Sequence, residues 1–583
     1  EYRGYDSAGI AVQEGDSLAV IHRKGKVASL EHTLSHFDFQ GTCGIGHTRW
    51  ATHGKPSEAN AHPHTSCGGH IAVVHNGIIE NFAELREELE GRGHVFTSET
   101  DTEVVAHLLE EAYQGDLVAA LRDACSRIVG AYGLAAVCDM EPGVIAVTRK
   151  DSPIVIGQGE DGAYVASDMI AMIDATRDVV ILGDGEYARM TASGIEYTDE
   201  AGHAIEPRIT HVDWDLDLAE KGGYPDFMLK EIHEQPRVIR DTLAGRLVNG
   251  ALSIDELDLT PEELNLIDRV YVIACGTSYH AGLIAKNLIE GWARIPTECE
   301  VASEFRYRNP ILEDGEMVII VSQSGETADS LAALRLAKEH GVRTLGIVNV
   351  VGSSIAREAD NVMYTWAGPE IAVATTKAYS CQLVAEYLLA LKFAQARGTI
   401  NQEQLTEYLH EIEMLPNQIE SLLGNRERIQ KFANRYVAAK DVFFIGRGID
   451  YAISLEGSLK LKEISYIHSE AYAAGELKHG TISLIEDGTL VTAVVTQEDL
   501  YKKTISNIVE VKTRGAYVLA VTNEDNLEIE KAADSVIYIP KTNSYFTNSL
   551  AIIPLQLFGY YVSVGKGLDV DKPRNLAKSV TVE

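Results

Sequence analysis

An internal repeat constrains the fold of this chain more than any other feature of its sequence. When the sequence is compared with itself at a shift of 174 positions, matching residues recur across its second half. A fixed spacing of this kind marks a structural unit that occurs twice in succession. The matched pairs are Ser322-Gln323 with Thr496-Gln497, Gly341 with Gly515, Asn349 with Asn523, and Ala359-Asp360 with Ala533-Asp534.

Each copy alternates apolar runs typical of strands with patterns typical of helices. In the first copy, 269–274, 317–321 and 344–348 read as strands, and 329–340 reads as a helix. Alternation of this kind is typical of a doubly wound parallel sheet. In both copies a strand runs into a glycine turn and a helix, at 274–278 and at 445–448. The repeat therefore predicts two α/β units with parallel sheets.

The segment from Ser322 to Thr327 reads as a cradle for a phosphate group. The hydroxyls of Ser322, Ser324 and Thr327 and the amide of Gln323 can donate hydrogen bonds to phosphate oxygens. Gly325 allows backbone N–H groups to approach an anion where the following helix begins and its dipole is positive. The alternative interpretation is an ordinary capped turn between a strand and a helix.

A second turn supports the phosphate interpretation. The strand that ends at Ala274 is followed by Gly276, Thr277 and Ser278, which offer further hydroxyl and amide donors. Because the carboxyl ends of parallel strands meet at one edge of a sheet, both turns should face one ligand. In the second copy the cradle position carries Glu498 and Asp499, whose charges would repel phosphate. Only the first copy is therefore expected to bind an anion there.

The first 216 residues follow a different pattern. Short strands rich in valine, isoleucine and alanine alternate with turns, and only two clear helices are predicted, at 81–91 and 103–115. This pattern indicates an α+β domain with antiparallel sheet. An acidic and then glycine-rich stretch at 213–223 is typical of an exposed linker.

Composition limits the classes of function. The chain has 583 residues, enough for three or four domains, and 86 acidic against 51 basic residues give a formal charge of −35. Such a charge disfavours nucleic acid and anionic membranes as partners, and no run of apolar residues is long enough for a membrane helix. Seven scattered cysteines without paired spacing favour a reducing compartment. The sequence therefore predicts a cytoplasmic protein.

The chain as a whole resembles the glutamine–fructose-6-phosphate aminotransferase (isomerising) family. Each matching motif is weak alone, but their order and joint presence are specific. The motifs are Tyr2 to Gly9, His47 to Gly54, His75-Asn76-Gly77, Thr100 to Glu103, Ser322 to Thr327, Glu470 to Gly480, and Lys578 to Glu583.

The resemblance implies the domain organisation and the reaction. It implies an α+β N-terminal-nucleophile glutaminase sandwich at 1–216, a linker at 217–227, and two sugar isomerase (SIS) units at 228–424 and 425–572. The tail at 573–583 would enter the active site. Glutamine and fructose 6-phosphate would yield glutamate and glucosamine 6-phosphate, the first step of hexosamine synthesis towards UDP-GlcNAc, with ammonia channelled between the sites. No cofactor or metal is implied, and a homodimer is expected.

By this resemblance, Arg49 and Asp101 bind the carboxylate and ammonium groups of glutamine, as their charges suit. Asn76 and the Gly77 amide form the oxyanion hole. Trp50 gates the channel, although a core aromatic residue is the alternative. Further glutamine-site residues are Arg3, Thr52 and His53.

The same resemblance makes Glu463 the base that moves a proton between two sugar carbons. It follows Lys460 by three positions, on one helical face, an arrangement otherwise typical of surface ion pairs. Lys578 would form an imine with the sugar carbonyl, and His479, from the neighbouring subunit, would assist ring opening. The sugar-binding residues implied are Cys275, Gly276, Thr277, Ser278, Ser322, Gln323, Ser324, Thr327, Val373, Thr375 and Ala577, with Thr375 replacing the family's serine.

The family's nucleophile is an N-terminal cysteine whose free amino group acts as the base. This chain starts with Glu1, so glutaminase activity is expected to be absent from the sequence as given. Cys43, in Thr42-Cys43-Gly44, has an internal position and is expected to be a buried strand cysteine. The isomerase half is expected to be complete.

Other interpretations remain open. His62-Pro63-His64 with Cys67 and His70 could suggest zinc, but the segment reads as a loop and the family carries it without metal. The chain could instead be a sugar-phosphate-sensing SIS regulator, which would need a DNA-binding segment that the sequence does not offer. A glutamine-independent isomerase or deglycase is a further alternative, disfavoured by the set Arg49, Asn76 and Asp101.

Overall fold

The computed structural model describes residues 4–211, 220–248 and 250–581 of the chain. Two compact units emerge: the first comprises residues 1–216 together with 326–328 and 577–583, and the second comprises the rest. Arg3, predicted to position glutamine, and residues 213–219 of the predicted linker region lie outside the described residues.

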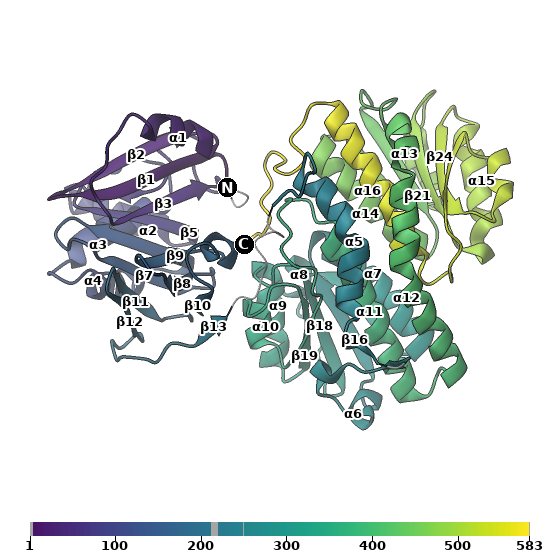
Figure 1. Cartoon of the computed structure of the whole chain (residues 1–583), viewed down its shortest axis with the longest axis horizontal. Helices are drawn as coiled ribbons and strands as arrows, with labels where there is room; N and C mark the ends of the chain where they lie inside the picture. The colour runs from purple at the N-terminus through teal and green to yellow at the C-terminus, as the bar shows by residue number, and fades with distance from the viewer. Residues whose placement is uncertain (1–3, 212–219, 249, 582–583) are drawn as a thin grey trace. The chain divides into compact units, whose positions relative to one another are not determined.

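The first unit is built of antiparallel sheets and helices (Figure 1). Its strands are β1 (Ser7–Glu14), β2 (Ser17–Lys24), β3 (Gly44–Arg49), β4 (His64–Thr65), β5 (Ile71–Ile79), β6 (Gly130–Cys138), β7 (Ile145–Lys150), β8 (Val155–Gln158), β9 (Ala163–Ala166), β10 (Asp178–Ile181), β11 (Tyr187–Thr191), β12 (Gly194–Thr198) and β13 (Ile209–His211). Its helices are α1 (Val27–Leu34), α2 (Phe82–Gly91), α3 (Glu103–Ala112) and α4 (Leu117–Cys125).

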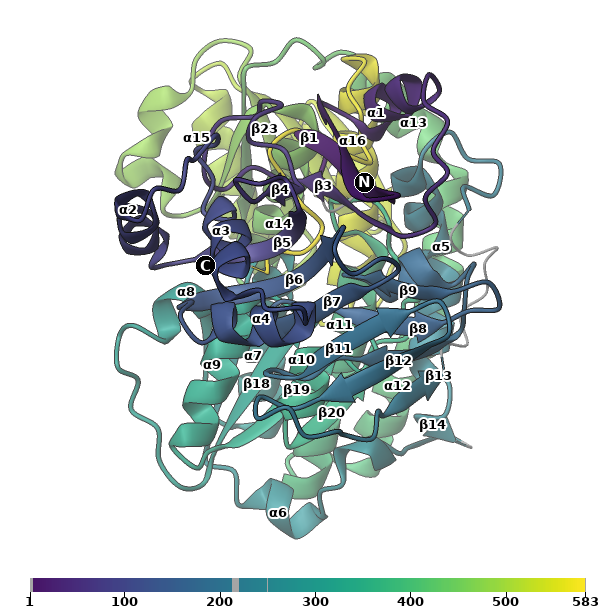
Figure 2. The same ribbon diagram turned by 90° about the vertical axis from the view of Figure 1, so that its left-hand side faces the viewer.

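A six-stranded sheet in the order β12-β11-β7-β6-β5-β4 forms the centre of the first unit. Because side chains alternate along a strand, β5 and β6 supply two separate cores. Val73 and Leu134 belong to one core with residues of α2, α3 and α4, and Figure 2 shows α3 and α4 beside this sheet. Val74 and Val137 face the opposite side and pack with strands of the other sheets. Helices therefore cover one face of this sheet, and strands of the other sheets pack on its opposite face.

The prediction of only two clear helices in this part was wrong. Helix α1 has a single buried residue, Leu30, so its apolar signal in the sequence is weak. Helix α4 begins after Asp116, whose carboxylate accepts hydrogen bonds from the N–H groups of Val118 and Ala119. Cys43 also differs from expectation, because it is only partly buried and precedes β3.

The second unit contains two parallel sheets with helices around them. Its strands are β14 (Leu247–Val248), β15 (Ala251–Leu252), β16 (Arg269–Ala274), β17 (Thr297–Val301), β18 (Glu316–Ser322), β19 (Arg343–Val348), β20 (Asn361–Tyr364), β21 (Asp441–Gly446), β22 (His468–Ala473), β23 (Leu490–Val495), β24 (Tyr517–Asn523) and β25 (Ser535–Ile539). The helices are α5 (Phe227–Leu243), α6 (Pro261–Asn265), α7 (Gly276–Leu288), α8 (Ala302–Phe305), α9 (Ala328–Glu339), α10 (Ser354–Glu358), α11 (Lys377–Arg397), α12 (Gln402–Gly424), α13 (Arg426–Ala433), α14 (Ile449–Ser465), α15 (Tyr501–Lys512) and α16 (Thr547–Gly565).

The two sheets confirm the repeat. One has the order β17-β16-β18-β19-β20, the other β22-β21-β23-β24-β25, and every pairing in both is parallel. Gly341 and Gly515, matched in sequence, both have positive φ angles, 74° and 93°, just beyond α9 and α15. A residue with a Cβ atom is disfavoured there. The predicted fold class is confirmed: an α+β domain followed by two α/β parallel-sheet units.

The strand register corrects the sequence alignment at one point. Ser322 pairs with Val348, whereas Val495 pairs with Thr522. Since Val348 and Thr522 correspond at the 174-residue spacing, Ser322 corresponds to Val495 and not to Thr496. The same shift of 173 residues relates the first residues of α9 and α15. The second copy therefore has the apolar side chain of Val495 at the position where the first copy has the hydroxyl of Ser322.

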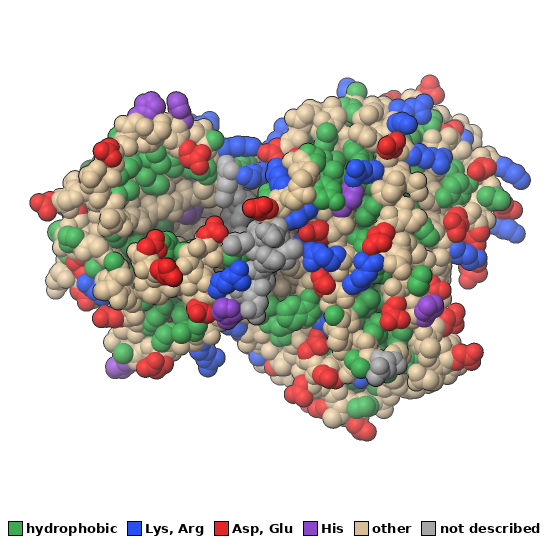
Figure 3. All heavy atoms as spheres, viewed as in Figure 1, with side chains coloured by type: hydrophobic (Ala, Val, Ile, Leu, Met, Phe, Trp, Pro, Cys, Tyr) green, Lys and Arg blue, Asp and Glu red, His purple; other side chains and the backbone are tan. Residues whose placement is uncertain are grey.

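One large core joins both sheets of the second unit through helices such as α11, α14 and α16. Among the described residues, no helix is both long and apolar enough to cross a membrane. On the face shown in Figure 3, red acidic side chains are interspersed with blue basic ones over this unit. A phosphate group therefore has to be held by a local site.

A carboxyl group buried in this core leads to a stability prediction. Glu386 of α11 is 1% exposed, and neither of its oxygens has a hydrogen-bond partner among the described residues. Burial raises the pKa of Glu386 well above its usual range. The side chain is then neutral in the folded chain and ionised in the unfolded chain at neutral pH. Folding takes up a proton, so this group's contribution to stability falls as pH rises above its ordinary pKa.

We expect Glu386→Leu to stabilise the chain, because an unsatisfied buried carboxyl costs about 1–3 kcal/mol. The gain should grow with pH, by up to about 1.4 kcal/mol per unit. Thermal unfolding of both proteins between about pH 5 and 8 measures it. Glu407→Leu, at an exposed position on α12, is the control. A gain that is constant over this range would contradict the proton uptake.

Candidate active sites

A pocket in the first unit gathers most of the residues predicted to bind glutamine. Its lining includes side chains from β3, β5 and the turn before α3, together with three residues of the tail. The residues are His47, Thr48, Arg49, Trp50, Thr52, His62, His75, Asn76, Gly77, Asp101, Thr102, Ala577, Ser579 and Thr581. His53 does not line the pocket, but its carbonyl oxygen accepts a hydrogen bond from Arg49.

Arg49 and Asp101 supply opposite charges to this pocket. Arg49 is 3% exposed; its Nη2 donates to the carbonyl oxygens of His53 and Gly54, whereas Nη1 has no hydrogen-bond partner among the described residues. Asp101, equally buried, accepts from the Ile79 N–H at 2.9 Å. Burial lowers the pKa of Arg49, and the nearby carboxylates of Asp101 and Asp6 oppose that shift. A buried guanidinium with an unused N–H group suits an anionic ligand.

Asn76 and Gly77 lie on β5 beside the same pocket. His47 Nε2 and Asn76 Oδ1 are 2.9 Å apart, and because a carbonyl oxygen can only accept, the imidazole is the donor. Gly77 has φ = 136°, and a Cβ atom there would lie 2.0 Å from the Ala131 carbonyl oxygen. Only glycine fits this backbone, which is consistent with an N–H group presented to a ligand.

Three buried histidines in or near the pocket, His47, His62 and His64, are neutral at physiological pH. Burial lowers the pKa of His47 to about 4, that of His64 to about 3, and that of His62 well below its usual range. The positive charge of Arg49 lowers all three further. These imidazoles therefore act as hydrogen-bonding and packing groups, and they leave Arg49 as the cation of the site.

In the second unit, the end of β18 leads into the predicted phosphate cradle. Ser322 Oγ accepts from the Gly325 N–H at 3.0 Å, which closes the turn. Gly325 has φ = 65°, and a Cβ atom there would lie 2.0 Å from Ser353 Oγ. Gln323 and Ser324 are partly exposed. Thr327 falls in the short segment grouped with the first unit.

A charged network joins the first copy to the second within this unit. Lys460 of α14 donates to Thr277 Oγ1 of α7 at 3.0 Å, and its Nζ lies 2.5 Å from Glu463 Oε2 and 3.5 Å from Glu456 Oε1. His280 Nδ1 lies 2.7 Å from Glu456 Oε2. The turn that sequence reasoning placed at the sugar phosphate is therefore bonded to the predicted proton-transfer pair.

Burial and charge oppose each other at Lys460. Its side chain is 0% exposed, and that burial alone would lower the pKa, but Glu463 and Glu456 outweigh it and raise the pKa. Lys460 therefore stays protonated. The Glu463 side chain is 20% exposed, so it keeps access to a ligand while its partner is enclosed. This pair is not the surface ion pair that the i, i+3 spacing most often indicates.

Glu456 and His280 were not predicted from the sequence. Glu456 precedes Lys460 by one helical turn, so the i, i+4 spacing was a signal that could have found it. His280 follows the Gly276 turn on α7, but its contact with Glu456 spans 176 residues. No local pattern could have indicated that contact.

The remaining predicted residues lie as follows. Ser278 accepts from Gln382 Nε2 at 2.9 Å, and Cys275 Sγ lies 3.7 Å from Ser330 Oγ. Gly276 has φ = 54° at the start of α7. Val373 is buried, and Thr375 is partly buried. His479 is exposed, and Lys578 belongs to the tail segment grouped with the first unit.

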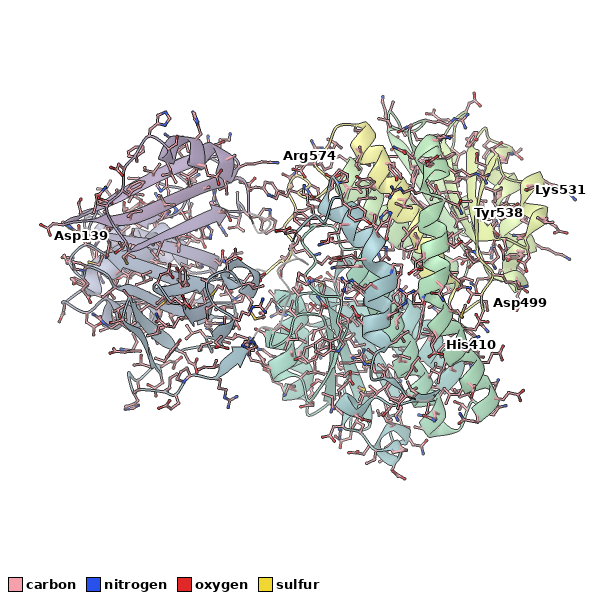
Figure 4. The ribbon with its side chains drawn as sticks, in the orientation of Figure 1. Asp139, His410, Asp499, Lys531, Tyr538 and Arg574 are labelled. Carbon is pink, nitrogen blue, oxygen red and sulfur yellow. The ribbon has the colours of Figure 1, made fainter. Side chains whose placement is uncertain are left out.

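The cradle of the second copy holds an internal carboxylate instead. Asp450, near the start of α14, accepts from the Thr496 N–H at 2.8 Å and from its hydroxyl. Burial raises the pKa of Asp450 to about 6, although these hydrogen bonds oppose the shift. Asp499, labelled in Figure 4, follows in the same loop. The N–H group that would face an anion in this copy is therefore already satisfied.

Comparison with known proteins identifies the family to which this chain is similar. A glutamine amidotransferase domain model matches residues 47–174, and a SIS domain model matches 263–392 and 436–564. The glutamine–fructose-6-phosphate aminotransferase (isomerizing) of Clostridium tetani is 55% identical over all of this chain and 96% of its own length. The relative of the same name from Caldanaerobacter subterraneus is 54% identical, with the same coverage.

Among solved structures, the C-terminal domain of glucosamine-fructose-6-phosphate aminotransferase from Francisella tularensis matches with a TM-score of 0.58. It is 38% identical and covers 60% of this chain and 99% of that domain. A glutamine amidotransferase domain and a tandem of SIS domains thus share this one chain. The chain belongs to the family of glutamine–fructose-6-phosphate aminotransferases of the isomerizing type.

Proposed function

We propose that this protein takes part in the reaction that makes glucosamine 6-phosphate and glutamate from fructose 6-phosphate and glutamine, and that the residues described here carry out its sugar-phosphate half with ammonia as the nitrogen source. The observation that carries the proposal is the Lys460–Glu463 pair bonded to Thr277. It sets a carboxylate of partial exposure beside the Gly276 turn, where a sugar held by its phosphate would present its carbon atoms. Family membership supplies the identity of both substrates.

The roles of the individual residues follow from their chemistry. Arg49 and Asp101 would bind the two charged groups of glutamine, and Asn76 with the Gly77 N–H would stabilise the oxyanion. Ser322, Gln323, Ser324 and the predicted Thr327 would hold phosphate. Glu463 would move the proton between the two sugar carbons. The positive charge of Lys460 would balance the negative charge of the Glu463 carboxylate during this transfer.

Further roles rest on the family alone. Lys578 is proposed to form the imine with the sugar carbonyl, and the exposed His479 to assist ring opening in a neighbouring subunit of a homodimer. Trp50, Thr52 and His53 are proposed to frame the glutamine pocket, and Val373, Thr375 and Ala577 to contact the sugar. The domain boundaries at 216, 227, 424 and 572 also remain predictions, as does a cytoplasmic location.

The test supplies purified chain with fructose 6-phosphate and ammonium, and measures glucosamine 6-phosphate and glucose 6-phosphate. Both should form, because the proposed proton transfer uses the Lys460–Glu463 pair and ammonium supplies the nitrogen for the amination. Glutamine binding is measured separately by calorimetry, and Arg49→Gln should weaken it. Absence of both sugar products with saturating substrates would refute the proposed reaction, whatever the glutamine result.

We expect one sugar phosphate to bind per chain, although the SIS unit occurs twice. Val495 replaces the hydroxyl of Ser322 in the register of the second sheet, and Asp450 already accepts from the Thr496 N–H. Titration with fructose 6-phosphate measures the stoichiometry. Gly325→Ala should abolish this binding, because a Cβ atom would meet Ser353. Two equivalents per chain would contradict the assignment of one functional cradle.

A further inference from the structure

Four potential metal ligands meet in the first unit, outside the glutamine pocket. Cys67 lies in the turn between β4 and β5, His94 lies after α2, and His107 and Glu110 lie on α3. One ligand atom from each residue lies within 4.8 Å of all the others. The proposed reaction uses none of these side chains.

Four of the six distances between these atoms are close to the edges of a tetrahedron around one metal ion. Cys67 Sγ lies 3.6 Å from the Nδ1 atoms of both His94 and His107. Glu110 Oε2 lies 3.3 Å from His94 Nδ1 and 3.8 Å from His107 Nδ1. A tetrahedral zinc ion with usual bond lengths has sulfur–nitrogen edges of about 3.6 Å and nitrogen–oxygen edges of about 3.4 Å. The four measured edges lie close to these values.

The groups around the cluster orient its ligands. Glu110 accepts from the N–H groups of Cys67 and Gly68, at 3.1 and 2.7 Å, and Cys67 Sγ accepts from the Val95 N–H at 3.3 Å. Backbone N–H groups therefore hold the Glu110 carboxylate and the Cys67 sulfur in place, whether or not an ion is bound.

Carboxylates also lie behind both imidazoles. His94 Nε2 is 3.4 Å from a Glu111 oxygen, and His107 Nε2 is 3.8 Å from a Glu103 oxygen. His107 is 1% exposed, and its Nε2 has no hydrogen-bond partner among the described residues. A carboxylate near the far nitrogen favours the tautomer in which Nδ1 carries the lone pair, as metal-binding histidines require.

The histidines that are close to Cys67 in the sequence are not part of the cluster. His64 Nε2 bonds to Thr100 Oγ1 at 3.0 Å, and His62 packs against His47 and His64. His70 Nδ1 bonds to Asp139, which is labelled in Figure 4. Of the set that could have suggested zinc in the sequence, only Cys67 therefore takes part.

We propose that Cys67, His94, His107 and Glu110 bind one divalent transition-metal ion of the zinc class. A thiolate and a carboxylate would neutralise the charge of the ion, with two neutral imidazoles completing the set. All four positions are filled by the protein, so the site is structural. It fastens the turn before β5 and the segment after α2 to α3, which begins two residues after Asp101. The proposal departs from the expectation, drawn from the sequence, that the chain holds no metal.

The test loads the full chain with zinc or cobalt(II), removes loose metal by dialysis, and measures bound metal by elemental analysis. We expect about one ion per chain and, with cobalt(II), a sulfur-to-metal charge-transfer band with the visible bands of tetrahedral cobalt. Cys67→Ser should lose the charge-transfer band, and His107→Ala should lose bound metal. Removal of zinc by a chelator should lower the unfolding temperature.

Cys43→Ser and His70→Ala are matched controls, since each removes the same residue type outside the cluster, and both should keep the metal. If a variant fails to fold, the cobalt spectrum of the unaltered chain still decides the question. Absence of bound metal and of the charge-transfer band in the unaltered chain would overturn the proposal. The four groups would then form a hydrogen-bonded cluster only.

Discussion

Replacement of Glu463 by glutamine should slow the conversion of fructose 6-phosphate to glucose 6-phosphate by about 10²- to 10⁴-fold. Glutamine has the shape of glutamate and can still approach Lys460, but it cannot accept the proton that moves between the sugar carbons. The Glu463 side chain is 20% exposed and therefore not fully buried, so the substitution should leave the fold intact. The loss should appear in kcat, with little change in KM, since the phosphate is held by a different segment.

The measurement is a coupled assay for glucose 6-phosphate over a range of fructose 6-phosphate concentrations. Glu358→Gln is a matched control: it removes the charge of a carboxylate that pairs with Arg335 at 2.8 Å on the surface of the first copy. That variant should retain the rate of the unaltered chain. If Glu463→Gln also retains the rate, another group is the base.

Most of the fold prediction for the second half of the chain came from the internal repeat. Gly341 and Gly515 end equivalent helices with positive φ angles, so their spacing reported a real structural correspondence. The alternation of strand and helix patterns then predicted parallel sheets, because parallel strands need long crossover connections. The spacing of 174 could not show that β18 and α9 are related to their counterparts by 173 residues. Strand pairing sets that register.

The proton-transfer network shows where prediction from sequence ends. The positions of Lys460 and Glu463 on one helical face followed from helix geometry. The hydrogen bond from Lys460 to Thr277 spans 183 residues, and the burial of Lys460 depends on the packing of α7 against α14. The cluster of Cys67 shows the same limit. His62, His64 and His70 are near in sequence, but the chain brings His94 and His107 to the sulfur.

Lys460→Met should abolish isomerisation and also destabilise the folded chain by about 3–5 kcal/mol. Lys460 and Glu456 are both 0% exposed, and Lys460 is the cation that lies 3.5 Å from Glu456 and 2.5 Å from Glu463. Methionine fills a similar volume without the charge, so the fully buried Glu456 carboxylate would lose the lysine that pairs with it and keep its contacts with His280 and Thr277. Denaturant unfolding measures the stability, and the sugar-phosphate assay measures the rate.

The double variant Lys460→Met with Glu456→Gln separates the two effects. The introduced glutamine would still accept a hydrogen bond from Thr277, as Glu456 does, so removal of the uncompensated charge should recover part of the lost stability. It should not recover activity, because Glu463 would still lack the cation that balances its charge during proton transfer. A double variant less stable than Lys460→Met would show that packing, and not the buried charge, dominates at this position. Recovery of activity would instead exclude Lys460 from the reaction.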